Sequence, residues 1–85
     1  MIKIDSIKNV SYGTLKGFAT ATVGGIKISD IKIIQQEGQK PWISLPSREF
    51  EVEGQKKYKP IVEIVDPDLK GALAAAILDA YYQGR

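Results

Sequence analysis

The sequence predicts an α+β fold, in which a curled antiparallel sheet of four to five strands carries one C-terminal helix packed on it. Two observations favour the sheet: apolar and polar residues alternate in short runs before residue 46, and a Gly-Gly pair at 24–25 is typical of a tight hairpin. A third predicts the helix, because an Asp-Pro-Asp start at 66–68 precedes a segment rich in alanine and leucine. A chain of 85 residues is expected to form one domain over residues 1–85.

The first two strands are predicted on either side of a loop. Ile2–Asp5 alternates apolar and charged residues, which is the period of a half-buried strand. Val10–Thr14 has the composition of a loop, and Lys16–Val23 follows as the second strand. The glycines at 24–25 can adopt the positive φ that a two-residue hairpin turn requires.

The third strand is expected to contain a β-bulge. Its apolar residues stand at even positions in Ile26 and Ile28 and at odd positions in Ile31 and Ile33. Because side chains alternate along a strand, the buried face changes parity only where an extra residue is inserted, and we place that residue at 29–30. The bulge should bend the sheet around the helix.

The segment from residue 36 to residue 65 is predicted as a turn, two short strands and an exposed arm. The turn covers Gln36–Gln39, and the fourth strand covers Pro41–Pro46, with a proline at each end that limits pairing. Ser47–Lys59 is rich in charge and is interpreted as an arm that could form a hairpin at Glu53-Gly54. Pro60–Val65 is predicted as a short last strand.

The helix is expected to run from Asp66 to about Tyr82. Its apolar residues form two stripes, one through Leu69, Leu73, Ala76, Ile77 and Ala80 and another through Ala74, Leu78 and Tyr82. The sheet can cover one stripe, and a second copy of the chain is the simplest cover for the other. The predicted homodimer interface is formed by Ala72, Ala75, Leu78, Tyr82 and Trp42.

Composition excludes several classes of protein. The chain has no cysteine and no histidine, so the common strong nucleophile and the common general base are missing, and we expect no enzyme. The same absence argues against a metal, and no cofactor or small-molecule substrate is expected. With no apolar segment of about 20 residues and no signal segment after Met1, the protein is expected in the cytoplasm, away from membranes.

A basic cluster is the candidate functional site. The residues proposed for nucleic-acid contact are Lys40, Arg48, Lys56, Lys57, Tyr58 and Lys59. Lysine and arginine neutralise phosphates, and a tyrosine ring can stack on an exposed base. The alternative is that three lysines near a turn keep the arm soluble and block edge pairing. The net charge of +2 permits a nucleic acid without requiring one.

The chain resembles the stage V sporulation protein G (SpoVG, septation regulator) family. The resemblance rests on Phe18-Ala19, residues 28–34, Glu37-Gly38 and above all the Trp-Ile-Ser-Leu-Pro-Ser-Arg stretch at 42–48. It implies a bacterial dimer of sheet plus C-terminal helix that binds DNA, or RNA in some members, and that regulates septation and sporulation. It also implies a DNA contact for Arg48, although Glu49 and Lys59 stand where the family commonly has a second basic residue and a histidine.

The function predicted from the sequence is therefore a DNA-binding regulator that acts as a homodimer, with RNA as a further partner class. The competing interpretation is a protein–protein adaptor on the same scaffold that has lost nucleic-acid binding. Glu49, Glu51 and Glu53 favour the adaptor, because mixed charge suits a protein partner better than a polyanion.

Overall fold

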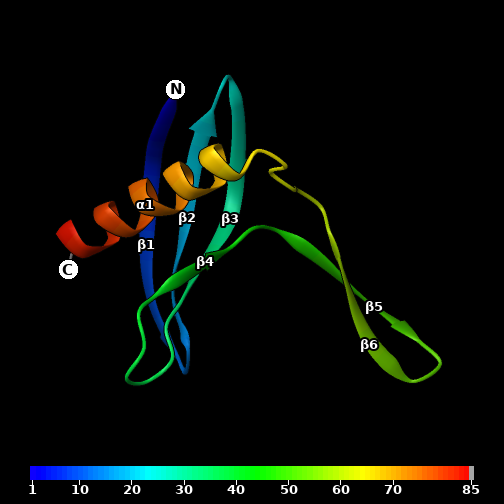
Figure 1. Cartoon of the computed structure of the whole chain (residues 1–85). Coiled ribbons are helices and arrows are strands. Elements are labelled where there is room, and N and C mark those ends of the chain that lie inside the picture. Colours follow the sequence, from blue (N-terminus) through cyan, green and yellow to red (C-terminus); the bar gives the residue numbers. More distant parts are fainter. Residues whose placement is uncertain (85) are drawn as a thin grey trace.

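The computed structural model describes residues 1–84 as two antiparallel sheets and one helix (Figure 1). The larger sheet has the order β1–β2–β3–β4, from β1 (Ile2–Tyr12), β2 (Leu15–Val23), β3 (Ile26–Ile34) and β4 (Trp42–Ser44). The smaller sheet is a hairpin of β5 (Ser47–Val52) and β6 (Gln55–Pro60), and the helix is α1 (Pro67–Gln83). The predicted α+β fold is confirmed.

Strand β1 is longer than predicted. Tyr12 pairs with Leu15, so the turn needs only Gly13 and Thr14, and Gly13 has a φ of 59°. The predicted loop over Val10–Thr14 is therefore wrong for its first three residues. Its apolar period is broken because the β1–β2 register shifts twice, and an irregular period hid the strand.

The predicted bulge in β3 is confirmed. Pairing jumps from Ala19–Ile31 to Ala21–Ile28, which leaves residues 29 and 30 opposite one residue of β2. Asp30 takes a φ of 59°, which lets Ile28 and Ile31 both point into the core.

A second bulge in β1 lies at the same level of the sheet. Ile4 pairs with Ala21 and Ser6 with Thr20, so Asp5 is the extra residue. Both bulges flank Thr20, one on each neighbouring strand. Bulges increase local twist, so the sheet curls around the helix from both sides of β2.

The helix lies across one face of the larger sheet and closes the core (Figure 1). The buried core among the described residues consists of Ala19, Ala21, Ile28, Ile31, Ile33, Leu73, Ile77 and Tyr81. The buried line Leu73–Ile77–Tyr81 takes its first two residues from the first predicted stripe, and Leu78 of the second stripe packs against the core beside it. The sheet therefore covers most of both stripes, leaving Tyr82 exposed, because the curled sheet reaches around both flanks of the helix.

The predicted last strand over Pro60–Val65 is wrong. Pro60 ends β6, and the residues after it form no strand in the described chain. Val62 and Ile64 pack against the core, whereas Val65 is 88% exposed. Buried and exposed side chains alternate in this connection because one side of it lies against the core. A strand gives the same alternation, but this segment pairs with no other strand in the described chain.

The start of α1 is as the sequence predicts. The Asp68 backbone N–H donates to Asp66 Oδ1 at 3.0 Å, and Pro67 occupies the first turn. The carboxylate satisfies one of the helical N–H groups that has no partner within the helix.

We predict that Asp66→Ala lowers the free energy of unfolding by about 0.5–2 kcal/mol, because it removes this cap. Asp66→Asn keeps a side-chain acceptor and should cost clearly less. Urea unfolding followed by circular dichroism measures both variants. Equal losses in the two variants would show that the charge of Asp66, rather than its hydrogen bond to Asp68, is what matters.

We predict opposite effects of a glycine-to-alanine substitution at two positions. A Cβ at Gly17 would lie 2.9 Å from the backbone oxygen of Lys8, so Gly17→Ala should destabilise the protein by about 1–3 kcal/mol. Gly71 lies in the helix with nothing within 4 Å of an added Cβ, and Gly71→Ala should stabilise by about 0.5–1 kcal/mol. Thermal and urea unfolding test the pair, and a stable Gly17→Ala variant would contradict the close β1–β2 approach.

Candidate nucleic-acid interface

The β5–β6 hairpin projects from the body of the protein (Figure 1), and all of its residues are exposed. Glu53 and Gly54 both have positive φ, of 51° and 79°, which is the geometry of a tight two-residue hairpin turn. The predicted turn is therefore confirmed. At the base of the hairpin, the N–H groups of Ile61 and Val62 donate to the Pro46 carbonyl at 3.0 and 3.3 Å.

One face of the hairpin is basic. In an antiparallel pair, directly opposed residues point to the same side, and Arg48 pairs with Lys59 while Phe50 pairs with Lys57. The basic face is thus formed by Arg48, Phe50, Val52, Gln55, Lys57 and Lys59. It combines three cations with two apolar side chains and contains no carboxylate.

The other face contains the glutamates. Glu49 opposes Tyr58 and Glu51 opposes Lys56, and the Lys56 ammonium lies 3.5 Å from a carboxylate oxygen of Glu49. Both partners are well exposed, so this ion pair contributes little to stability. The Glu49 carboxylate does offset the charge of Lys56 locally. We call the side of the hairpin formed by Glu49, Glu51, Lys56 and Tyr58 the glutamate face.

The register therefore divides the predicted binding residues. Arg48, Lys57 and Lys59 share the basic face, whereas Lys56 and Tyr58 stand on the glutamate face. Glu49 follows Arg48 in sequence but points to the other side, so it does not oppose a phosphate at Arg48. Strand alternation counted from Arg48 would have found this division in the sequence and would have added Phe50, which sequence reasoning missed.

Lys40 lies apart from the hairpin. It is in the loop between β3 and β4, and this loop and the hairpin lie at opposite ends of β4 (Figure 1). The structure does not bring Lys40 together with the basic face.

The residues predicted for a dimer interface fall into two groups. Ala72, Ala75 and Tyr82 are exposed and share one helical stripe with Asp79, on the side away from the sheet. We call these four residues the solvent stripe. Leu78 instead packs on the core, and Trp42, which is 49% exposed, lies in β4.

A cleft of about 350 Å³ opens beside Trp42. It lies between β4, the connection over residues 60–64 and the N-terminal half of α1, and its apolar lining includes Ile43, Leu45 and Val62. Lys70 and Glu63 also line it. Such a cleft can accept an apolar side chain. Its two charged lining residues have opposite signs, so the cleft does not favour a ligand of one charge.

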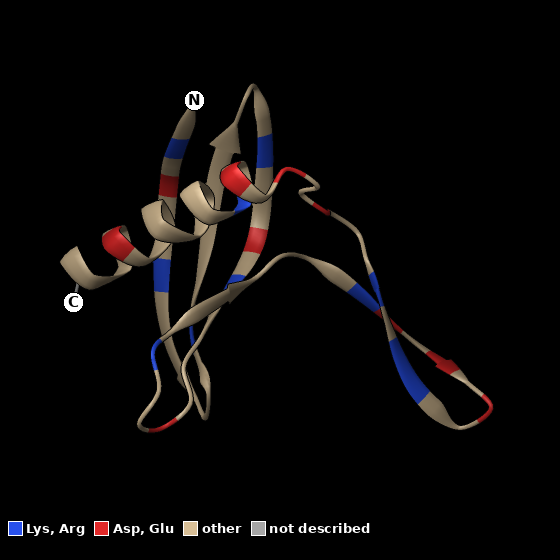
Figure 2. Cartoon of the chain, viewed as in Figure 1, with Lys and Arg blue, Asp and Glu red and all other residues tan. Residues whose placement is uncertain are grey.

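Charge is unevenly distributed over the described chain (Figure 2). Residues 1–34, which form β1–β3, contain five lysines and two aspartates. Residues 61–84, which form α1 and its approach, contain four acids and one lysine. The sheet is therefore the basic layer of the molecule and the helix the acidic one.

The described residues contain neither a candidate metal site nor a candidate membrane-spanning helix. Within residues 1–84, no three His, Cys, Asp or Glu side chains gather as a metal site would require. The helix in this part of the chain does not meet the length and apolarity needed to cross a bilayer.

Comparison with known proteins places the chain in a family. No curated protein and no solved structure matches it. The SpoVG family model, however, matches residues 1–83, nearly the whole chain. The protein belongs to the SpoVG family, a family of regulators associated with septation and sporulation.

Proposed function

We propose that this protein is a cytoplasmic DNA-binding regulator that acts as a homodimer and contacts DNA through the basic face of the β5–β6 hairpin. The observation that supports the proposal is the segregation of charge on the hairpin. Arg48, Lys57 and Lys59 point to one side and the glutamates at 49 and 51 to the other. Such a face can approach a polyanion without bringing a carboxylate with it.

The shape of the hairpin also fits DNA. A two-stranded β-ribbon is narrow enough to enter the major groove, which is about 12 Å wide. The three cations can reach phosphates, and Phe50 and Val52 can contact base methyl groups between them. Contacts of this kind are dominated by phosphate, so the proposed binding discriminates weakly between sequences.

The isolated hairpin needs a partner on energetic grounds. A two-stranded ribbon without a covering layer is marginally stable in water. No other described element covers β5 or β6, and Phe50 and Val52 remain exposed on the basic face. Contact with DNA would cover this face and order the arm.

A homodimer would double the basic face. Three cations bind weakly, whereas six release twice as many counterions and steepen the salt dependence. The solvent stripe supports such a dimer, because Ala72 and Ala75 let another backbone approach closely and Tyr82 supplies exposed aromatic surface. Trp42 lies beside the cleft and offers a second apolar contact.

The adaptor is the second candidate function, and the cleft beside Trp42 is what favours it. A partner protein could place an apolar side chain between β4 and α1 while its charged groups meet Lys70 and Glu63. An adaptor of this kind would use the cleft rather than the basic face. Substitutions on the basic face should then leave its binding intact.

We predict that Lys57→Gln weakens binding of a labelled DNA duplex and that Lys56→Gln does so much less. The two lysines are neighbours in β6, but Lys57 lies on the basic face and Lys56 on the glutamate face. Lys57→Gln removes one phosphate contact from each chain that binds, so the slope of log affinity against log salt should become shallower by about 0.9 per chain. Fluorescence anisotropy at low and physiological salt measures both quantities.

Two results would count against the proposal. Equal effects of Lys56→Gln and Lys57→Gln would show that the hairpin does not bind through one face. If the wild-type protein did not bind duplex DNA at low salt, the proposed DNA-binding function would be wrong and the adaptor would be the remaining candidate.

We predict that Ala75→Arg converts the dimer to a monomer, because it places a large charged group in the solvent stripe. Ala75 is exposed in the single chain, so the fold should survive the change. Gln36→Arg, in the exposed β3–β4 loop, adds the same charge elsewhere and should not alter the mass. Light scattering measures the mass of each protein. An unchanged mass in Ala75→Arg would place the interface outside the stripe.

A further inference from the structure

The face of the β1–β4 sheet opposite α1 is uncovered in the described chain (Figure 1). We call it the open face. Its residues follow from the register, because core residues and outward residues alternate. The open face contains Lys3, Ser6, Lys8, Phe18, Thr20, Thr22, Lys27, Lys32 and Ser44, and Asp5 reaches it from the β1 bulge, where its carboxylate contacts Lys3 and Thr22.

An aromatic residue lies between two lysines on this face. Phe18 in β2 pairs with Lys8 on β1 and with Lys32 on β3, so the three form one row across the sheet. Two strand spacings separate the lysines, which is about 10 Å. Phe18 is half-buried, yet it is not among the apolar residues that pack against the core. The flanking lysine stems are the neighbours that the register places beside its ring.

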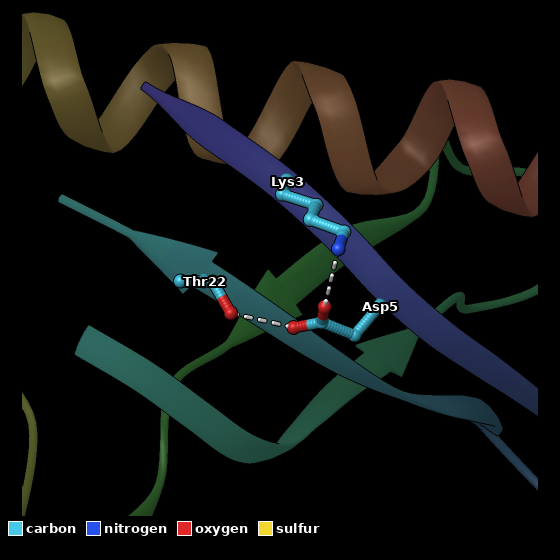
Figure 3. A network of polar contacts seen from close by, with 3 residues as sticks. All are labelled: Lys3, Asp5 and Thr22. Carbon is cyan, nitrogen blue, oxygen red and sulfur yellow. Dashed lines mark hydrogen bonds and ion pairs between the residues drawn. The ribbon is translucent and has the colours of Figure 1, made fainter. Parts of the chain in front are cut away.

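The positive charge of the open face is largely unneutralised. Lys3 lies 4.0 Å from Asp5, and the Thr22 hydroxyl donates to the other oxygen of the same carboxylate at 2.7 Å (Figure 3). The Asp5 carboxylate therefore offsets the charge of Lys3 and not that of the other open-face lysines. Within the described residues 1–84, Lys8, Lys27 and Lys32 form no ion pair.

We infer that the open face binds single-stranded nucleic acid, with a base stacked on Phe18 and phosphates held by Lys8, Lys27 and Lys32. Every base has a π-face that can stack on an aromatic ring, and a single strand exposes that face whereas a duplex does not. An aromatic ring between cations on an exposed sheet supplies both contacts at once. The inference rests on the proposed function, because it adds a second surface to a nucleic-acid-binding protein.

Charge argues against the other occupant of an open sheet face, a second copy of this chain. Face-to-face packing would bring the lysine-rich surface formed by Lys8, Lys27 and Lys32 against the same surface of the second copy. Like charges brought together in an interface are destabilising, and Asp5 already forms an ion pair with Lys3 of its own chain. A polyanion removes this repulsion.

The experiment compares a fluorescent single-stranded oligothymidine with a duplex of the same length. Phe18→Leu removes the π-face and keeps an apolar side chain. It should weaken single-strand binding roughly 5- to 150-fold, the range expected for one base–aromatic stack. Phe18→Tyr keeps the ring and should bind as the wild type does. Duplex affinity, which is proposed to depend on the hairpin, should be the same in all three proteins.

A second variant tests the cations. Lys8→Gln combined with Lys32→Gln should lower the single-strand salt slope by about 1.4 and leave the slope for duplex unchanged. Both positions are exposed, and circular dichroism verifies that each variant is folded. Light scattering verifies that the mass is unchanged.

The outcomes separate this inference from the proposed function. If the wild type binds duplex but not the single strand, or if Phe18→Leu binds the single strand as the wild type does, the open face is not the site and the proposed function stands. If Phe18→Leu loses its dimer, the face is a contact between copies and the inference is overturned. If the wild type binds neither DNA at low salt, both ideas fall.

Discussion

Burial of one helical line, Leu73–Ile77–Tyr81, against one face of a bent sheet is the interaction on which the rest of the structure depends. The sheet can enclose this line because bulges at Asp5 and at residues 29–30 curl it on both sides of β2. A single helix covers one face and no more. The small core therefore leaves the open face, the solvent stripe and the hairpin without cover in the described chain, and these are the surfaces available for binding.

Register decides what each of these surfaces presents. In the β5–β6 hairpin, charges that are mixed in sequence become separated in space because Arg48 is paired with Lys59. A slip of one residue between β5 and β6 would place Glu49 opposite Lys59 and mix the two faces again. The tight turn at Glu53-Gly54 fixes the register, since both residues hold the positive φ that a two-residue turn requires. A backbone constraint at the tip thus determines the electrostatics of the whole arm.

Much of the fold followed from the sequence where local chemistry is specific. The parity change between Ile28 and Ile31 located the bulge, and the Asp66 cap located the helix start. Prediction failed where one pattern has two physical causes. The apolar residues over Pro60–Val65 were interpreted as a strand, but they belong to a connection whose Val62 and Ile64 side chains pack on the core. For the candidate site, the basic residues were proposed as one group. Their division between two faces follows from strand alternation carried across the Glu53-Gly54 turn, and that alternation was not counted.

The polarity of the molecule connects the proposed surfaces. Four acids in residues 61–84 make the helix layer unfavourable for a polyanion, whereas the lysines of β1–β3 lie in the sheet layer. Pairing of two copies through the solvent stripe would therefore use the surface that nucleic acid avoids. It would place the two helices inside and turn both open faces outward, because the sheet and the solvent stripe lie on opposite sides of α1. In this arrangement dimer formation and nucleic-acid binding do not compete for surface, and each copy adds its own cations to the same assembly.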